Sequence, residues 1–165
     1  MNYIFIGNGI ISLSTAFRLI KNLKGSDKII ILGKSERPGS ATLAAPAMLN
    51  SFCEIEHGYL DYEFNRIRFK MNREATKMWP AFLNEINKNL TKDFLKNNYI
   101  DQNINKGTFL INNASADLLD DINYEAIISS LNQFNEPYDE IKARDIPGYK
   151  PSQRNRSNRA IFINN

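Results

Sequence analysis

The sequence is poor in the residues that build disulfides and zinc sites, and it contains no long apolar run. Its 165 residues include one cysteine, Cys53, and one histidine, His57. These counts exclude a disulfide scaffold and a zinc site built on cysteine or histidine ligands. No stretch approaches the ~20 apolar residues that cross a bilayer, and the N-terminus lacks the basic start of a signal peptide. We therefore expect a cytoplasmic protein without a membrane span.

The charge balance is mild, with a formal net charge of +3, and ten Phe and seven Tyr argue against disorder. One local basic excess stands out between residues 142 and 160, where six Lys and Arg residues accompany a single acid, Asp145. No aromatic ladder or nucleic-acid-reading motif accompanies these charges. We expect a solvated basic surface here and no nucleic-acid partner.

The first 33 residues follow a strand–helix–strand pattern. Residues 3–6 form a short apolar run that predicts a strand buried on both faces. Apolar residues then recur at helical spacing from Ile10 to Leu23, and Gly25 follows the last basic turn. A second apolar run covers residues 29–32. This order predicts a parallel βαβ unit.

The rest of the chain predicts a mixture of helices and strands. We expect a loop that leads into a short helix between residues 34 and 47, and helical structure from Tyr59 to about Asn89 that Pro80 ends or kinks. Further along we expect a strand at 107–111, a helix at 116–134 capped by Ser115, a weak strand at 136–141 and a last strand at 160–163.

The motif that carries chemistry is Gly7-x-Gly9-x-x-Ser12. A nucleotide diphosphate needs the backbone of such a turn to come close, and side chains at the first two positions would block it. The helix that begins near Ile10 would offer free N–H groups to the phosphates. The alternative is a tight strand-to-helix turn in another kind of α/β protein.

The acidic residue that usually holds the ribose hydroxyls at the end of the second strand is absent. Gly33 stands there, followed by Lys34. Two explanations remain open: a cation in place of the carboxylate accommodates the 2′-phosphate of NADP, or FAD is held through other contacts.

Residues 4–16 and 37–49 together resemble the N-terminus of the FAD-dependent D-amino-acid oxidase family, which includes glycine oxidase, sarcosine oxidase and D-amino-acid dehydrogenase. Members carry a glycine turn that runs into a Leu-Ser-Thr-Ala-like helix, and later a small-residue loop that ends in Gly-Met-Leu. Looser similarity continues through residues 106–111 and 138–151. The resemblance implies a Rossmann-like FAD-binding βαβ unit in residues 1–58 and part of an α+β substrate domain in residues 59–165.

The resemblance also implies flavin contacts. The diphosphate would lie against Gly7, Gly9, Ile10 and Ile11, with Lys34 near the adenosine. Ala41 and Thr42 would meet the diphosphate and ribitol, and the isoalloxazine ring would lie beside Ala45, Pro46, Ala47 and Met48. The chain departs from the family pattern in three places, at Ser12, Gly33 and Ala47, where the family has glycine, an acid and glycine.

The resulting hypothesis is the N-terminal part of an FAD-dependent oxidoreductase that oxidises the C–N bond of an amino acid or secondary amine. The sequence assigns no catalytic residue, because His57 and Cys53 are expected to be structural, and it assigns no metal. Two alternatives stay open: a non-catalytic remnant or subunit that associates with another chain or with itself, and an NADP-binding protein.

Overall fold

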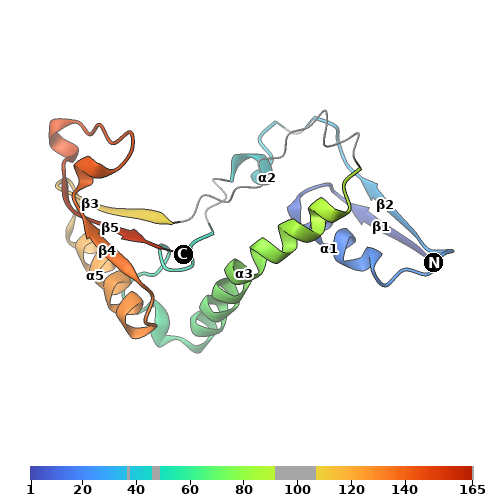
Figure 1. Ribbon diagram of the computed structural model, residues 1–165, viewed down its shortest axis with the longest axis horizontal. Helices are drawn as coiled ribbons and strands as arrows, with labels where there is room; N and C mark the ends of the chain where they lie inside the picture. The colour runs from blue at the N-terminus through green and yellow to red at the C-terminus, as the bar shows by residue number, and fades with distance from the viewer. Residues whose placement is uncertain (37, 46–48, 92–106, 165) are drawn as a thin grey trace. The chain divides into compact units, whose positions relative to one another are not determined.

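A computed structural model describes residues 1–36, 38–45, 49–91 and 107–164. The chain divides into two compact units, residues 1–48 and residues 49–165 (Figure 1). The fold is mixed α/β. The first unit contains a parallel β–α–β arrangement, and the second contains helices and a small antiparallel sheet of three strands.

The first unit begins with β1 (Asn2–Ile6), α1 (Ile10–Ile20) and β2 (Lys28–Leu32). The two strands pair in parallel with Ile4 opposite Ile30, which confirms the predicted parallel unit. Ala16, a small residue, is the buried residue of α1. The helix ends three residues earlier than predicted, at Ile20 rather than Leu23.

The prediction that the first strand is buried on both faces is wrong for the described residues. The side chains of β1 alternate between exposed and half-buried, and Ile4 and Ile6 are 60% and 89% exposed. Ile30 and Leu32 of β2, their partners in register, are exposed as well. Among the described residues of this unit α1 is the one long helix, so it can cover one face of the two-stranded sheet, and Ile4, Ile6, Ile30 and Leu32 are exposed on the other.

The short helix expected in the loop after β2 is α2 (Ala41–Ala44). Ser40 precedes it, and the Ser40 hydroxyl accepts a hydrogen bond from the Leu43 amide. Such a cap satisfies one of the N–H groups that a helix start leaves without a partner. This cap fixes where Ala41 and Thr42 begin the helix.

The second unit opens with a single-turn 3-10 helix, Tyr59–Asp61, and the long helix α3 (Glu63–Lys88). Pro80 lies inside one continuous helix, so the prediction that it ends the helix is wrong, and the alternative that it kinks the helix stays a prediction. Trp79 and Phe82 flank this proline in the sequence, and their ring centroids are 5.5 Å apart. Their contact supports the turn in which Pro80 cannot donate a backbone hydrogen bond.

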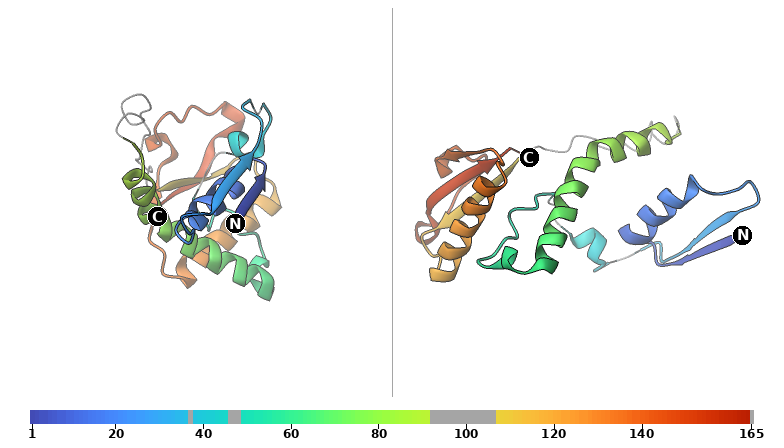
Figure 2. Two further views of the ribbon diagram at one scale, coloured as in Figure 1. Left: turned by 90° about the vertical axis from the view of Figure 1, so that its right-hand side faces the viewer. Right: turned by 90° about the horizontal axis from the view of Figure 1, so that it is seen from below.

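The sheet of the second unit contains β3 (Thr108–Asn113), β4 (Tyr138–Ile141) and β5 (Ser157–Ile163), with β5 in the middle and both pairings antiparallel. The helix α5 (Leu118–Gln133) runs beside this sheet in Figure 1 and in the right-hand view of Figure 2. The predicted cap of this helix is wrong. Asp117 is the cap, because its carboxylate accepts from the amides of Leu119 and Asp120, and Asp120 accepts from the Asp117 amide in return.

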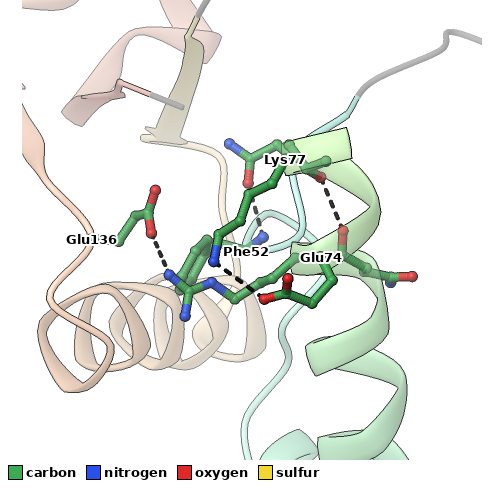
Figure 3. Close-up of polar contacts among 8 residues, drawn as sticks. Phe52, Glu74, Lys77 and Glu136 are labelled. Carbon is green, nitrogen blue, oxygen red and sulfur yellow. Dashed lines mark hydrogen bonds and ion pairs between the residues drawn. The ribbon is translucent and has the colours of Figure 1, made fainter. Parts of the chain in front are cut away.

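The core of the second unit brings together α3, α5, β5 and the segment before the 3-10 turn. It is formed by seven buried apolar residues: Phe52, Ile55, Phe69, Ile127, Leu131, Ile161 and Ile163. Arg73 of α3 lies at its border, where the guanidinium is 5.3 Å from the ring centres of Phe52 and Phe134 and donates to Glu136 at 2.7 Å (Figure 3). The aromatic faces and the carboxylate together compensate this largely buried charge.

Candidate nucleotide-binding site

The turn between β1 and α1 has the backbone conformation that the glycine motif predicts. Gly7 has a φ of +103°, in a region that residues with a side chain rarely adopt. Its amide donates to the Leu32 carbonyl at 2.7 Å, which ties the turn to the end of β2. The turn is therefore anchored at the carboxyl ends of both strands, the edge where ligands bind in open α/β sheets.

The N-terminus of α1 presents backbone donors at this edge. Gly9 precedes the helix and has no side chain to cap it, and the first turn contains no acidic residue. In an α-helix the first N–H groups have no partner within the helix, here those of Ile10, Ile11 and Ser12. Together with the positive end of the helix dipole, they favour an anion at this position.

Thr42, from α2, reaches this same helix end. Its hydroxyl oxygen accepts a hydrogen bond from the Ile10 amide at 3.2 Å. A Cβ added to Gly9 would lie 3.3 Å from this oxygen, tighter than ordinary contact, so glycine lets the hydroxyl approach. A hydroxyl that accepts from Ile10 keeps its own hydrogen to donate to a bound oxyanion. The Ile10 amide is thereby occupied, which leaves the amides of Ile11 and Ser12 as the backbone donors at this helix start.

Gly33, which stands in place of the expected acid, is required by the packing of Asn8. A Cβ at position 33 would lie 2.4 Å from Cγ and 2.8 Å from Cβ of Asn8, distances that real structures essentially never show. The Asn8 side chain is held there because its amide nitrogen donates to the Lys34 carbonyl at 2.9 Å. Asn8 was not among the predicted site residues. Two features of the sequence together could have indicated it: a polar side chain inside the turn, and a glycine in place of the expected acid at the end of the second strand.

The remaining predicted residues fall into two groups. Lys34, Ala41 and Ala45 are described: the Lys34 side chain is exposed beside the turn, Ala41 begins α2 and Ala45 ends it. Pro46, Ala47 and Met48, predicted to lie beside the isoalloxazine ring, are outside the described residues. The structure thus brings the predicted diphosphate contacts Gly7, Gly9, Ile10, Ile11 and Thr42 to one turn.

His57 and Cys53, which are expected to have structural roles, both lie in the second unit. The His57 backbone amide donates to the Asn123 side chain at 2.9 Å. Cys53 packs against the core, and burial, reinforced by the charge of Glu54, raises the pKa of its thiol to about 11. A thiol with such a pKa is protonated and unreactive near neutral pH.

Among residues 1–36, 38–45, 49–91 and 107–164, no three His, Cys, Asp or Glu side chains are grouped so as to hold a metal ion. Over the same residues, no helix has both the length and the apolar character needed to cross a membrane.

In the comparisons with known proteins, no family model matches this chain and no curated protein matches it significantly.

Proposed function

We propose that residues 1–45 form the diphosphate-binding unit of an FAD-dependent oxidoreductase of the amino-acid-oxidase type. The observation that carries this proposal is the 3.2 Å hydrogen bond between the Ile10 amide and the Thr42 hydroxyl. It brings to the start of α1 the residue that the sequence resemblance assigns to the flavin diphosphate. Two segments 32 positions apart in the sequence then offer donors to one bound anion.

The packing of Asn8 removes one argument for NADP. The NADP alternative depends on reading Gly33 and Lys34 as a pocket for a 2′-phosphate. Because Asn8 fills the space above Gly33, the glycine has a steric cause that involves no phosphate.

When bound, the flavin would supply the redox chemistry, accepting a hydride from the C–N bond of an amino acid or secondary amine. This chain's part at the turn is to bind and orient. The backbone donors of Ile11 and Ser12 and the hydroxyl of Thr42 would fix the diphosphate, and Gly7 and Gly9 would keep its approach clear.

A titration of FAD with the purified chain tests the proposal through quenching of flavin fluorescence. We expect saturable binding, and a protein purified with flavin bound would be yellow. Thr42→Val should weaken binding about fivefold, the effect of one net hydrogen bond of ~1 kcal/mol. Thr15→Val is the matched control, since it removes the same hydroxyl one turn further along α1, where Thr15 only bonds the Ile11 carbonyl.

A chain that takes up no FAD while its β1–α1–β2 unit is folded would contradict the proposal. An equal loss of FAD affinity in Thr42→Val and Thr15→Val would contradict the proposed contact between Thr42 and the diphosphate. Tighter binding of NADPH than of FAD in the same assay would favour the NADP alternative.

The open face of the β1–β2 sheet favours a second candidate function, association with another chain. Ile4, Ile6, Ile30 and Leu32 lie on this face and are all exposed. Contiguous exposed aliphatic side chains of this kind mark interaction sites in soluble proteins. Sedimentation velocity over a range of protein concentrations tests it: Ile6→Lys should reduce self-association, and a wild-type chain that stays monomeric would exclude self-association.

A further inference from the structure

The connection between β4 and β5 is unusually long for two neighbouring antiparallel strands. Residues 142–156 form it, 15 residues between Ile141 and Ser157. Connections in compact domains are usually ~4–6 residues long, and those beyond ~12 residues are commonly functional. It is seen at one end of the sheet in Figure 1, where the colour turns from orange to red.

This connection is held in place by its own hydrogen bonds. It contains the 3-10 turns Ala143–Asp145 and Gln153–Asn155. The Tyr149 hydroxyl donates to the Asn155 carbonyl at 3.4 Å, and the Arg156 carbonyl accepts from the Ala114 amide at 2.7 Å. The side chains it carries therefore start from fixed backbone positions.

Its charges are largely of one sign and unpaired. The connection carries five cations, Lys142, Arg144, Lys150, Arg154 and Arg156, and one acid, Asp145. Arg144 lies 4.0 Å from Asp145, both being exposed. The side chains of Lys142, Lys150, Arg154 and Arg156 form no ion pair with any described residue. Like charges kept together without partners destabilise a fold slightly, which favours an anion nearby.

Three of these cations line one groove. Its walls include Lys142, Arg144, Arg156 and the half-buried Tyr149. Arg159 of β5 also lines it, but this guanidinium already pairs with Glu125 and lies 4.8 Å from the Tyr124 ring centre. Lys150 and Arg154 belong to the same connection but do not line the groove.

From this arrangement we infer that the groove binds the phosphate group of a small molecule, with Lys142 and Arg156 as its main ligands. A hollow lined by cations suits a compact anion, and an arginine fork matches phosphate oxygens in two parallel hydrogen bonds. Single-stranded nucleic acid fits less well, because Tyr149 is the one aromatic residue among those that line the groove, and a strand needs several rings on which successive bases stack.

The inference is tested on the full chain by calorimetric titration with inorganic pyrophosphate in 0.15 M salt, where diffuse surface attraction is screened beyond about 8 Å. Two double variants remove the same charge from the same connection. Lys142→Ala/Arg156→Ala should weaken binding about tenfold or more, and Lys150→Ala/Arg154→Ala by less than about threefold. Circular dichroism confirms that both double variants remain folded. Arg156→Lys keeps the positive charge and should therefore lose less affinity than Lys142→Ala/Arg156→Ala.

Each opposite result overturns the inference. Equal losses in the two double variants would show general electrostatic attraction. Tighter binding of an oligouridine than of pyrophosphate would point to nucleic acid. Pyrophosphate binding that depends on Thr42 and not on Lys142 and Arg156 would place the anion at the glycine turn, so the groove and the proposed FAD site are tested separately.

Discussion

A side chain at position 33 should destabilise the first unit, and removal of the Asn8 side chain should restore much of the lost stability. Gly33→Ala places a Cβ 2.4 Å from Asn8 Cγ. Gly33 does not have the positive φ that would add backbone strain to this change, so the effect isolates the steric conflict. Overpacking of this kind costs ~1–3 kcal/mol.

The compensating change is Asn8→Gly. Alone it loses the hydrogen bond to the Lys34 carbonyl, for which we expect a cost of about 1 kcal/mol. In the double variant Asn8→Gly/Gly33→Ala the conflict is gone, so the two changes together should cost less than their sum. The expected coupling is ~1 kcal/mol or more, above the error of a double-mutant cycle.

Hydrogen exchange read by mass spectrometry is the suitable assay, because Trp79, the one tryptophan, lies in the second unit and does not report on the first. The Gly7 amide, bonded to Leu32, and the amides of β1 and β2 should exchange about five- to a hundredfold faster in Gly33→Ala. Trp79 fluorescence should stay unchanged as an internal control. Unaltered exchange in Gly33→Ala, or a double variant no better protected than Gly33→Ala, would refute the packing account of Gly33.

Three further predictions concern the second unit. Asp117→Ala should lower the free energy of unfolding by ~1 kcal/mol in urea titrations followed by Trp79 fluorescence, with Ser115→Ala as a matched control that changes nothing; equal effects would place the cap at Ser115 after all. Arg73→Ala should cost ~2 kcal/mol in the same titration, because it removes the contacts to three aromatic rings and leaves Glu136 unpaired; a loss below about 0.5 kcal/mol would show a surface pair. Since burial raises the pKa of Cys53 to about 11, its alkylation by iodoacetamide should be slow at pH 8 and rise steeply only towards pH 11; fast reaction at pH 8 would show an accessible thiolate.

Local sequence signals were sufficient for the elements that short-range chemistry determines. The βαβ unit follows from two apolar runs and a glycine turn, and the position of β5 follows from the apolar run around Ile161. The errors have long-range or competing causes. Burial of β1 depends on what covers the sheet, which periodicity cannot show. The α5 cap depends on competition between Ser115 and Asp117, which the reciprocal bond with Asp120 decides.

The sequence predicted residues of the candidate site but not the hydrogen bonds and packing contacts between them. The glycine motif pointed to Gly7 and Gly9, and the resemblance pointed to Thr42. That the Thr42 hydroxyl accepts a hydrogen bond from the Ile10 amide could be seen only in the structure. The role of Asn8 was missed, because its contact with Gly33 joins two segments that the motif treats separately. A departure from a motif at one position can thus be the consequence of a second residue that the motif does not specify.

The loss of the ribose carboxylate has a measurable consequence for how this chain would recognise FAD. An acid at position 33 would clash with Asn8, so in the proposed site the ribose hydroxyls would lack their usual acceptor there. The donors at Ile11, Ser12 and Thr42 would remain, and in that proposal all three would address the diphosphate. ADP should therefore compete with FAD in the fluorescence titration, whereas adenosine should compete at least about tenfold more weakly. If adenosine competes as well as ADP, affinity does not originate at the turn, and the donors at the start of α1 are not its source.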